Sequence, residues 1–221
     1  MYKLSPSKAH RYLHCTKSLE FDKEFVETPQ TVRGSILHEL AEMTLKNEDT
    51  LSFIEQHKIN EYELYLINGY AQEIWSEMTK VPNAKVIVEE KRPILIYNNN
   101  INLIVDCLIL GDNTATIFDL KTGNGDVDIE DNEQLYFYAY MVATSYENIE
   151  TFNLNIYQKG KRKTIEISKQ EVFDFFIDKE EVFTQIAENK LTYNPSDKAC
   201  KFCSIKDTCL IRARWIIGGK K

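Results

Sequence analysis

Two apolar runs joined by a short turn constrain the fold of this chain more than any other feature. Residues 101–110 and 115–123 both read as strands, and the Gly-Asp-Asn between them is typical of a hairpin turn. Asp106 interrupts the first strand, and Asp119 and Lys121 lie two residues apart on the second. Because residues i and i+2 of a strand point to the same face, we expect Asp119 and Lys121 side by side. The hairpin can bring Asp106 close to both.

Two carboxylates and a lysine on one sheet are suited to holding a divalent cation and activating water against a phosphodiester. The alternative is a surface hairpin that carries an Asp–Lys ion pair, and D-x-K alone does not decide between the two. Glu89 and Glu90 interrupt an earlier apolar strand. Strict alternation points one of them inward, so one is a further candidate acid, and the sequence leaves open which.

The hydrophobic period predicts helices before, between and after the strands. Helices are expected from Ser5 toward Cys15 and over residues 31–46, 60–80, 132–145 and 168–189. Strands are expected over residues 85–97, 101–110, 115–123, 151–158 and 162–167. This order predicts an α/β fold with a mixed central β-sheet flanked by helices, followed by a C-terminal cysteine-bearing segment.

The composition is that of a globular protein, with 221 residues, 43% hydrophobic and 28% charged. No apolar run approaches the roughly 20 residues of a membrane helix, and the first residues lack the apolar core of a signal peptide. We therefore expect a cytoplasmic protein with no membrane partner. In that compartment, five cysteines favour metal ligands or buried thiols over disulfides.

Four of the cysteines form a pattern. Cys200, Cys203 and Cys209 give C-x2-C-x5-C, and Cys15 lies near the other end of the chain. Three closely spaced thiolates and a distant fourth suit a zinc ion or a cubane iron–sulfur cluster. Cys107 follows Asp106 on a strand and faces the opposite side, so we interpret it as a buried thiol.

Positive charge is concentrated near the C-terminus. The net charge is −7, but residues 198–221 carry +6, which leaves about −13 on the first 197 residues. A second basic group occupies residues 159–163. This asymmetry favours a localised track for a polyanion over a uniform binding face, although basic tails are often merely solvated.

Two predicted helices carry further candidates. Gly34 lies inside a helix, where glycine costs about 1 kcal/mol relative to alanine, so it indicates close packing. His38 follows one turn later and can serve as an imidazole ligand, although most helical histidines are not ligands. Gln134 and Tyr138 share one helix face and can contact a phosphate or a base, although such a pair is usually core packing.

Together, these motifs resemble a known family. They are GxxxH at Gly34 and His38, an acid at Asp106, D-x-K at Asp119 and Lys121, and QxxxY at Gln134 and Tyr138. In this order they resemble the RecB-type branch of the PD-(D/E)XK nucleases. The cysteine pattern is similar to that of the iron–sulfur subgroup, which includes CRISPR-adaptation nucleases, the AddB nuclease domain and phage-encoded relatives. The opening residues 4–15 also look like the start of phage proteins in this group, and the match spans residues 15–209.

The resemblance implies a restriction-endonuclease-like core and a role for each motif residue. The ligands of Mg²⁺ or Mn²⁺ would be His38, Asp106, Asp119 and the backbone carbonyl of Leu120. Lys121 would orient or deprotonate the attacking water and offset charge in the transition state, with Asp106 and Asp119 completing the catalytic set. Gln134 and Tyr138 would position the nucleic acid. Two positions depart from the family pattern: Leu103 replaces the usual glycine, and the acid at Asp119 is the shorter variant.

The resemblance also implies a structural [4Fe–4S] cluster, with zinc as the alternative. Its ligands would be Cys15, Cys200, Cys203 and Cys209. The expected organisation is a single nuclease domain over residues 1–221. Within it, residues 1–30 form an N-terminal helix with one cluster cysteine, residues 31–190 the nuclease core, and residues 191–221 a basic cluster-binding segment.

The sequence thus predicts a metal-dependent DNA exonuclease or end-processing nuclease. Its expected substrate is DNA, single-stranded or with a free end, with a protein partner in recombination or CRISPR machinery. Two alternatives stay open: a catalytically weak member that acts as a DNA- or protein-binding module, and a zinc-stabilised interaction protein with a coincidental D-x-K. The intact set of His38, Asp106, Asp119 and Lys121 favours the enzyme, because a binding module does not need all four.

Overall fold

The computed structural model describes residues 2–22, 27–130 and 132–219. The chain divides into two compact units, and each is described by itself. The first unit combines three stretches of the chain, 1–25, 93–103 and 173–221, and the second comprises residues 26–92 and 104–172. No helix in the described part of the chain is both long enough and apolar enough to cross a membrane.

Five strands form one sheet in the order β1-β2-β3-β4-β5. They are β1 (Lys85–Ile96), β2 (Asn99–Leu110), β3 (Thr114–Lys121), β4 (Thr151–Gln158) and β5 (Lys161–Ser168). The β2–β3 and β4–β5 pairs are antiparallel, whereas β3 and β4 run parallel. The predicted α/β class, with a mixed sheet flanked by helices, is confirmed.

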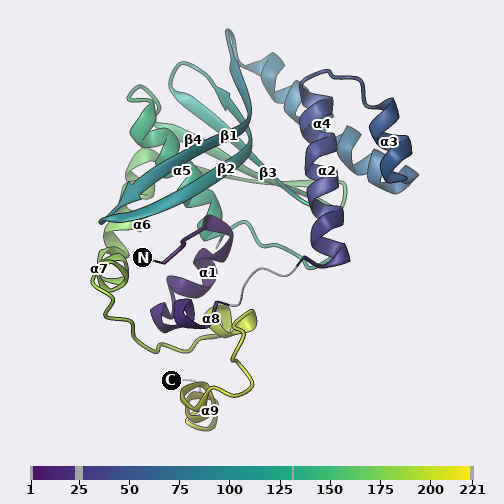
Figure 1. Ribbon diagram of the computed structural model, residues 1–221. Coiled ribbons are helices and arrows are strands. Elements are labelled where there is room, and N and C mark those ends of the chain that lie inside the picture. Colours follow the sequence, from purple (N-terminus) through teal and green to yellow (C-terminus); the bar gives the residue numbers. More distant parts are fainter. Residues whose placement is uncertain (1, 23–26, 131, 220–221) are drawn as a thin grey trace. The chain divides into compact units, whose positions relative to one another are not determined.

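In the second unit, α2 (Pro29–Leu45) and α4 (Glu61–Lys80) lie side by side (Figure 1). Thr28 and Asn60 begin these helices with reciprocal capping boxes, which satisfy free N–H groups of the first turn. The short helix α3 (Leu51–His57), which the sequence did not predict, lies between them in the chain and contacts α2. The core of this unit joins both long helices to β2, β3 and β4 through Leu40, Ile67, Tyr70, Ile109, Phe118, Leu120 and Tyr157.

Helix α5 (Glu133–Ser145) connects the parallel strands β3 and β4 and contacts both. Phe118 and Leu120 pack in the core with α2 and α4, whereas Asp119 bonds to Gln134 of α5. Because neighbouring residues of a strand face opposite sides, α5 covers the other face of the sheet. Strand β3 is therefore buried on both faces, as parallel strands usually are.

Two helix glycines mark close approaches in the second unit. A Cβ atom at Gly34 would lie 3.2 Å from Thr122 Oγ1, directly after β3. A Cβ atom at Gly69 would lie 2.1 Å from the hydroxyl of Tyr157 on β4. The close packing predicted at Gly34 is therefore confirmed, and it brings α2 against the end of the strand that carries Asp119 and Lys121.

In the first unit, the helices are short and come from both ends of the chain. They are η1 (Pro6–Lys8), α1 (Ala9–Tyr12), η2 (Thr16–Phe21), α6 (Lys169–Asp178, of which the residues from Phe173 on belong here), α7 (Glu180–Ala187), α8 (Asp197–Lys201) and α9 (Leu210–Ile217). Helix α1 contacts α8, and η2 contacts α7. Hydrogen bonds also join the two ends: Thr192 N–H donates to Thr16 Oγ1 at 2.8 Å, and Ser204 Oγ donates to the carbonyl of Phe21.

The single helix predicted over residues 168–189 is wrong, because two helices, α6 and α7, meet at Lys179. The N–H of Lys179 bonds to Phe176 O, and its carbonyl accepts the N–H of Phe183, which starts the second helix. The predicted capping box at the start is confirmed, since Ser168 and Glu171 exchange side chain to backbone hydrogen bonds of 2.7 and 3.2 Å.

Candidate active site

The candidate site lies where the pairing of β2 and β3 ends. Their ladder runs from Leu110↔Ala115 to Cys107↔Phe118. At the next position along β2, a side chain replaces the backbone as the acceptor: Asp106 Oδ2 accepts the Leu120 N–H at 2.7 Å. The predicted hairpin is confirmed. It holds one carboxylate between the strands, beside the segment that carries Asp119 and Lys121.

Helix α2 supplies an imidazole to this carboxylate. His38 Nδ1 lies 3.2 Å from Asp106 Oδ1. Burial lowers the pKa of His38, but the hydrogen bond to Asp106 and the charges of Asp106, Asp119 and Glu89 outweigh it and raise the pKa above its ordinary value. The surroundings of His38 therefore favour its positively charged form.

Strand β1 contributes a third group, Glu89. His38, Glu89 and Asp106 each offer one ligand atom, and these atoms all lie within 4.8 Å of one another. Burial, together with the charges of Asp106 and Glu42, raises the pKa of Glu89 above its ordinary value. Glu90 is directed elsewhere, since its Oε1 lies 2.9 Å from Arg92 Nη2. Of the two acids that the sequence left open, Glu89 is the one in the site.

The backbone at Glu89 explains why alternation could not decide between the two. Glu89 has φ 55°, in the left-handed region. That region is unfavourable for a side-chain-bearing residue and persists where the surrounding structure compensates, often at functional sites. Strict alternation of side chains requires extended backbone, which Glu89 does not have. The sequence pattern could therefore identify only the pair of Glu89 and Glu90, not which of the two lies in the site.

Asp119 and Lys121 are joined to α5 by a network of short contacts. Lys121 Nζ lies 2.8 Å from Asp119 Oδ2 and donates to Gln134 Oε1 at 2.8 Å. Gln134 Nε2 in turn donates to Asp119 Oδ1 at 3.0 Å and to the Tyr138 hydroxyl. Burial raises the pKa of the Asp119 carboxyl above its ordinary value, and the Lys121 ammonium opposes this shift.

The amide of Gln134 is fully used within the protein. Its oxygen accepts from Lys121, and its nitrogen donates to Asp119 and Tyr138. Tyr138 is buried, and burial holds the pKa of its hydroxyl well above the ordinary value. In this structure Gln134 fixes the positions of Asp119 and Lys121, and contact of Gln134 or Tyr138 with nucleic acid stays a prediction.

The donor set fits a divalent cation. Asp119 is only 3% exposed, and apart from the ion pair with Lys121 its Oδ2 accepts no hydrogen bond from any described residue. Buried carboxylate oxygens are costly unless a cation or donor compensates them. Carboxylates are the groups that Mg²⁺ and Mn²⁺ prefer, and an imidazole completes the set. Leu120 contributes its N–H to Asp106, and a metal role for its carbonyl stays a prediction.

Residues 2–218 match the model of the family described as "Protein of unknown function (DUF2800)". The chain belongs to the DUF2800 family. Among solved structures, it is similar to a protein titled "Putative exonuclease" from Eubacterium rectale, with 12% identity and a TM-score of 0.50 over 93% of this chain and 87% of that one. It also matches the crystal structure of SSO0001, with 13% identity and a TM-score of 0.43 over 96% of this chain and 88% of that one. The similarity to the first of these structures shows that this DUF2800 chain shares its fold.

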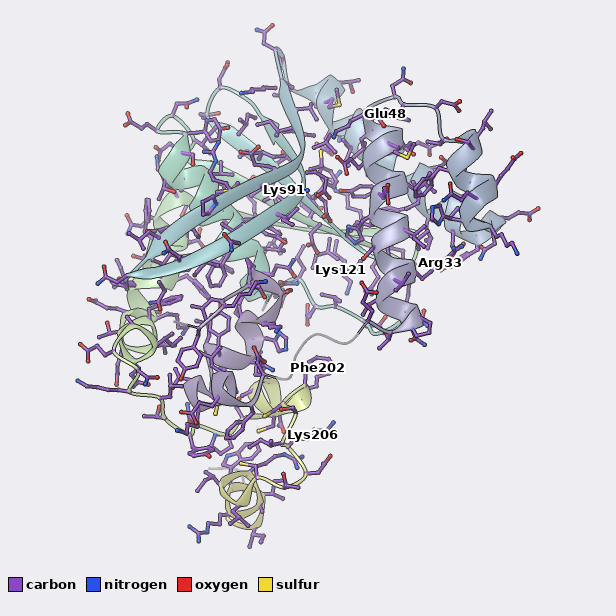
Figure 2. All side chains as sticks on the ribbon, in the orientation of Figure 1. Arg33, Glu48, Lys91, Lys121, Phe202 and Lys206 are labelled. Carbon is purple, nitrogen blue, oxygen red and sulfur yellow. The ribbon has the colours of Figure 1, made fainter. Side chains whose placement is uncertain are left out.

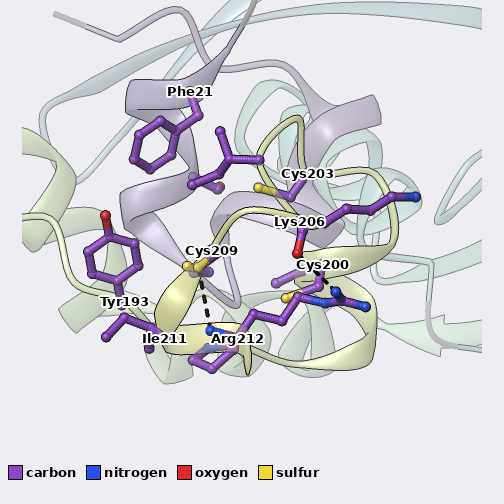
Figure 3. A pocket seen from close by; sticks show the side chains of 13 residues that line it. Phe21, Tyr193, Cys200, Cys203, Lys206, Cys209, Ile211 and Arg212 are labelled. Atoms are coloured by element: carbon purple, nitrogen blue, oxygen red, sulfur yellow. Dashed lines mark hydrogen bonds between the residues drawn. The ribbon is translucent and has the colours of Figure 1, made fainter. Parts of the chain in front are cut away.

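A second group of candidate residues in the DUF2800 chain lies in the first unit. Cys15, Cys200, Cys203 and Cys209 line one pocket, together with Phe21, Tyr193, Lys206, Ile211 and Arg212 (Figure 3). Cys15 Sγ accepts the N–H of Asn194, and Cys209 Sγ accepts the N–H of Arg212, each at 3.4 Å.

The fifth cysteine is placed differently. Cys107 is fully buried in the core of the second unit, where burial raises the pKa of its thiol to about 12. The structure thus brings together the four cysteines that the spacing singled out and confirms that Cys107 is a buried thiol.

Proposed function

We propose that this protein is a metal-dependent deoxyribonuclease that hydrolyses phosphodiester bonds at DNA ends, that is, an exonuclease or end-processing nuclease. The observation that carries the proposal is the cation-binding group of His38, Glu89 and Asp106 next to the linked pair of Asp119 and Lys121. An ion pair at the surface would not require two half-buried acids, Glu89 and Asp106, beside the buried Asp119. The nuclease-like fold adds support, since the similar structure from Eubacterium rectale is titled an exonuclease.

Each residue then has a separate task. His38, Glu89, Asp106 and Asp119 would hold Mg²⁺ or Mn²⁺, with the Leu120 carbonyl as a further ligand. The bound ion would polarise the phosphate and lower the pKa of a water molecule. Lys121 would orient that water and stabilise the negative charge that builds up on the phosphate oxygens. Gln134 keeps Lys121 extended toward the site. From the sequence resemblance, such an activity would belong to recombination, CRISPR adaptation or a phage, and a protein partner would come from the same setting.

We further propose that Cys15, Cys200, Cys203 and Cys209 hold a structural [4Fe–4S] cluster. The four cysteines line one pocket, as the ligands of a shared metal group must, and thiolates are the ligands of both iron–sulfur clusters and structural zinc. Zinc is the alternative that metal analysis separates from the cluster.

A cleavage assay tests the proposed activity. Single- and double-stranded DNA labelled at the 5′ or the 3′ end is incubated with Mn²⁺, Mg²⁺ or EDTA. We expect cleavage with either metal and none in EDTA, and the labelled end that is lost first reports the polarity. Cleavage that persists in EDTA, or a wild-type protein that binds DNA without cleaving it, would contradict the proposal. The second result would favour the DNA-binding module.

His38→Ala should weaken metal binding more than it changes the fold. Helix α2 is held by Leu37, Leu40 and Ala41 in the core, and the His38 side chain does not belong to that contact surface. We expect a higher Mn²⁺ concentration for half-maximal activity, with activity partly restored at saturating Mn²⁺. The measurement is a Mn²⁺ titration of the cleavage rate beside a thermal melt. An unchanged titration curve would reduce His38 to a packing residue.

Glu89→Gln and Glu90→Gln form a matched pair on neighbouring positions. We expect Glu89→Gln to weaken Mn²⁺ binding by at least the roughly 10- to 100-fold that loss of an outer-shell partner costs, because it removes one proposed charged ligand. Glu90→Gln should leave Mn²⁺ binding unchanged, because Glu90 pairs with Arg92 and is not part of the metal-binding group. Isothermal titration of the apoprotein with Mn²⁺ checks both. Equal effects would show that the left-handed backbone at Glu89 does not serve the metal.

A further inference from the structure

An exposed aromatic ring lies between two of the cluster cysteines. Lys201 and Phe202 separate Cys200 from Cys203. Phe202 is 64% exposed, although both of these cysteines line the pocket described above. The His10 ring meets it edge-on, with centroids 5.4 Å apart, and Lys201 Nζ lies 5.2 Å from the ring centroid. The ring is thus fixed on a short, anchored segment while much of its surface faces solvent, as Figure 2 shows for the labelled Phe202.

The surroundings of Phe202 are basic. In the described part of the chain, Lys201, Lys206 and Arg212 form no ion pair. Instead, Lys206 Nζ donates to Lys201 O at 3.4 Å, and Arg212 Nη1 donates to Lys206 O at 2.9 Å. Because the acceptors are backbone carbonyls, these bonds leave the positive charges of Lys206 and Arg212 without a neutralising carboxylate. Asp207 is the single acid after residue 198.

We propose that Phe202 stacks on a base of single-stranded nucleic acid whose phosphates are neutralised by Lys201, Lys206 and Arg212. Aromatic rings that receive bases beside cations that follow the backbone are the general means of binding single strands without sequence preference. An acidic peptide would neutralise the three cations but would not account for the exposed aromatic ring beside them. This inference rests on the proposed function and names where a strand is held outside the candidate active site.

The test compares two probes with equal charge. Fluorescence anisotropy is measured with a labelled 20-nucleotide oligothymidine and with an abasic oligonucleotide of the same length, without added divalent metal so that neither is cleaved. The variants are Phe202→Ala, Phe202→Leu and Lys201→Gln/Lys206→Gln. Ile177→Ala is the matched control, because Ile177 is 58% exposed in α6 but lies outside the basic segment.

Phe202→Ala should weaken oligothymidine binding about 5- to 150-fold, the cost of one lost stacking contact, and leave abasic binding unchanged. Phe202→Leu should weaken oligothymidine binding by a smaller factor and should likewise leave abasic binding unchanged. The double lysine variant should weaken both probes and reduce the salt-dependence slope by about 1.4, since each phosphate contact on a single strand contributes roughly 0.7. Ile177→Ala should bind both probes like wild type.

Equal loss for both probes, or no loss, in a Phe202 variant would overturn the proposal. The metal content and a thermal melt accompany each variant. If Phe202→Ala loses the metal, the comparison of the two probes is made with Phe202→Leu instead. A separate assay, Mn²⁺-dependent hydrolysis of bis(p-nitrophenyl) phosphate, tests the chemistry without a strand, and Phe202→Ala should retain the wild-type rate. A wild-type protein inactive in that assay would contradict the proposed hydrolysis, while the anisotropy data would still decide the role of Phe202.

Discussion

Lys121→Ala is expected to lower metal-dependent DNA cleavage about 10²- to 10⁴-fold, the usual contribution of a positioned proton-transfer group. Mn²⁺ affinity should change little, because the carboxylates and His38 are retained. Initial cleavage rates and isothermal titration with Mn²⁺ measure the two effects. This separation distinguishes a residue that acts in the chemical step from a metal ligand.

Asp119→Ala should abolish both metal binding and cleavage, because it removes a proposed charged ligand and the ion-pair partner of Lys121. Lys80→Ala is the control, since Lys80 is exposed and pairs with Glu77 at the end of α4. Circular dichroism should show a wild-type fold for all three variants. A Lys121→Ala variant as active as wild type would refute the assigned chemistry.

The largest effect on stability is expected at the cysteines. Replacing Cys15, Cys200, Cys203 or Cys209 by alanine should bleach the protein and unfold most of the first unit. Structural metals contribute about 10–16 kcal/mol in small metal-folded domains, which is comparable with the 5–15 kcal/mol stability of a whole domain. The helices around the pocket are short and cannot replace that contribution with a core of their own.

Iron and sulfide analysis of anaerobically purified protein, with absorbance near 400 nm, checks this expectation. About four irons per chain would support the cluster, and Cys107→Ser should keep the colour because Cys107 lies in the core of the other unit. One zinc per chain without sulfide would replace the cluster with a zinc site. Colour retained by Cys15→Ala would remove Cys15 from the ligands.

The parts of the fold that depend on local periodicity could be predicted. The two-residue period of β2 and β3 and the turn between them determine the hairpin, and the hairpin alone brings Asp106 to Leu120. The alternation within β3 likewise places Asp119 and Lys121 on one face. Motif order added His38 and Gln134, which lie on helices whose packing no local pattern specifies.

Other parts depend on contacts that the sequence does not display. Phe176 and Phe183 are seven residues apart, a spacing that continues one helical face, so the break at Lys179 left no mark in the apolar pattern. Gln134 has all its hydrogen-bonding atoms toward Asp119, Lys121 and Tyr138, which spacing cannot distinguish from an amide that faces a ligand. The expected division of one nuclease domain into residues 1–30, 31–190 and 191–221 stays a prediction.

The discontinuous first unit has a consequence for how the protein is made. Residues 26–92 and 104–172 form the second unit, so its chain is complete before Cys200 is synthesised. Translation at about 5–20 residues per second leaves Cys15 waiting roughly 10–40 s for its partners. During that interval the proposed cluster would lack three of its four thiolates, so Cys15 would be a free thiol on the nascent chain. If the proposed cluster forms, we expect its insertion to follow synthesis of residue 209 and to come after the second unit has all its residues.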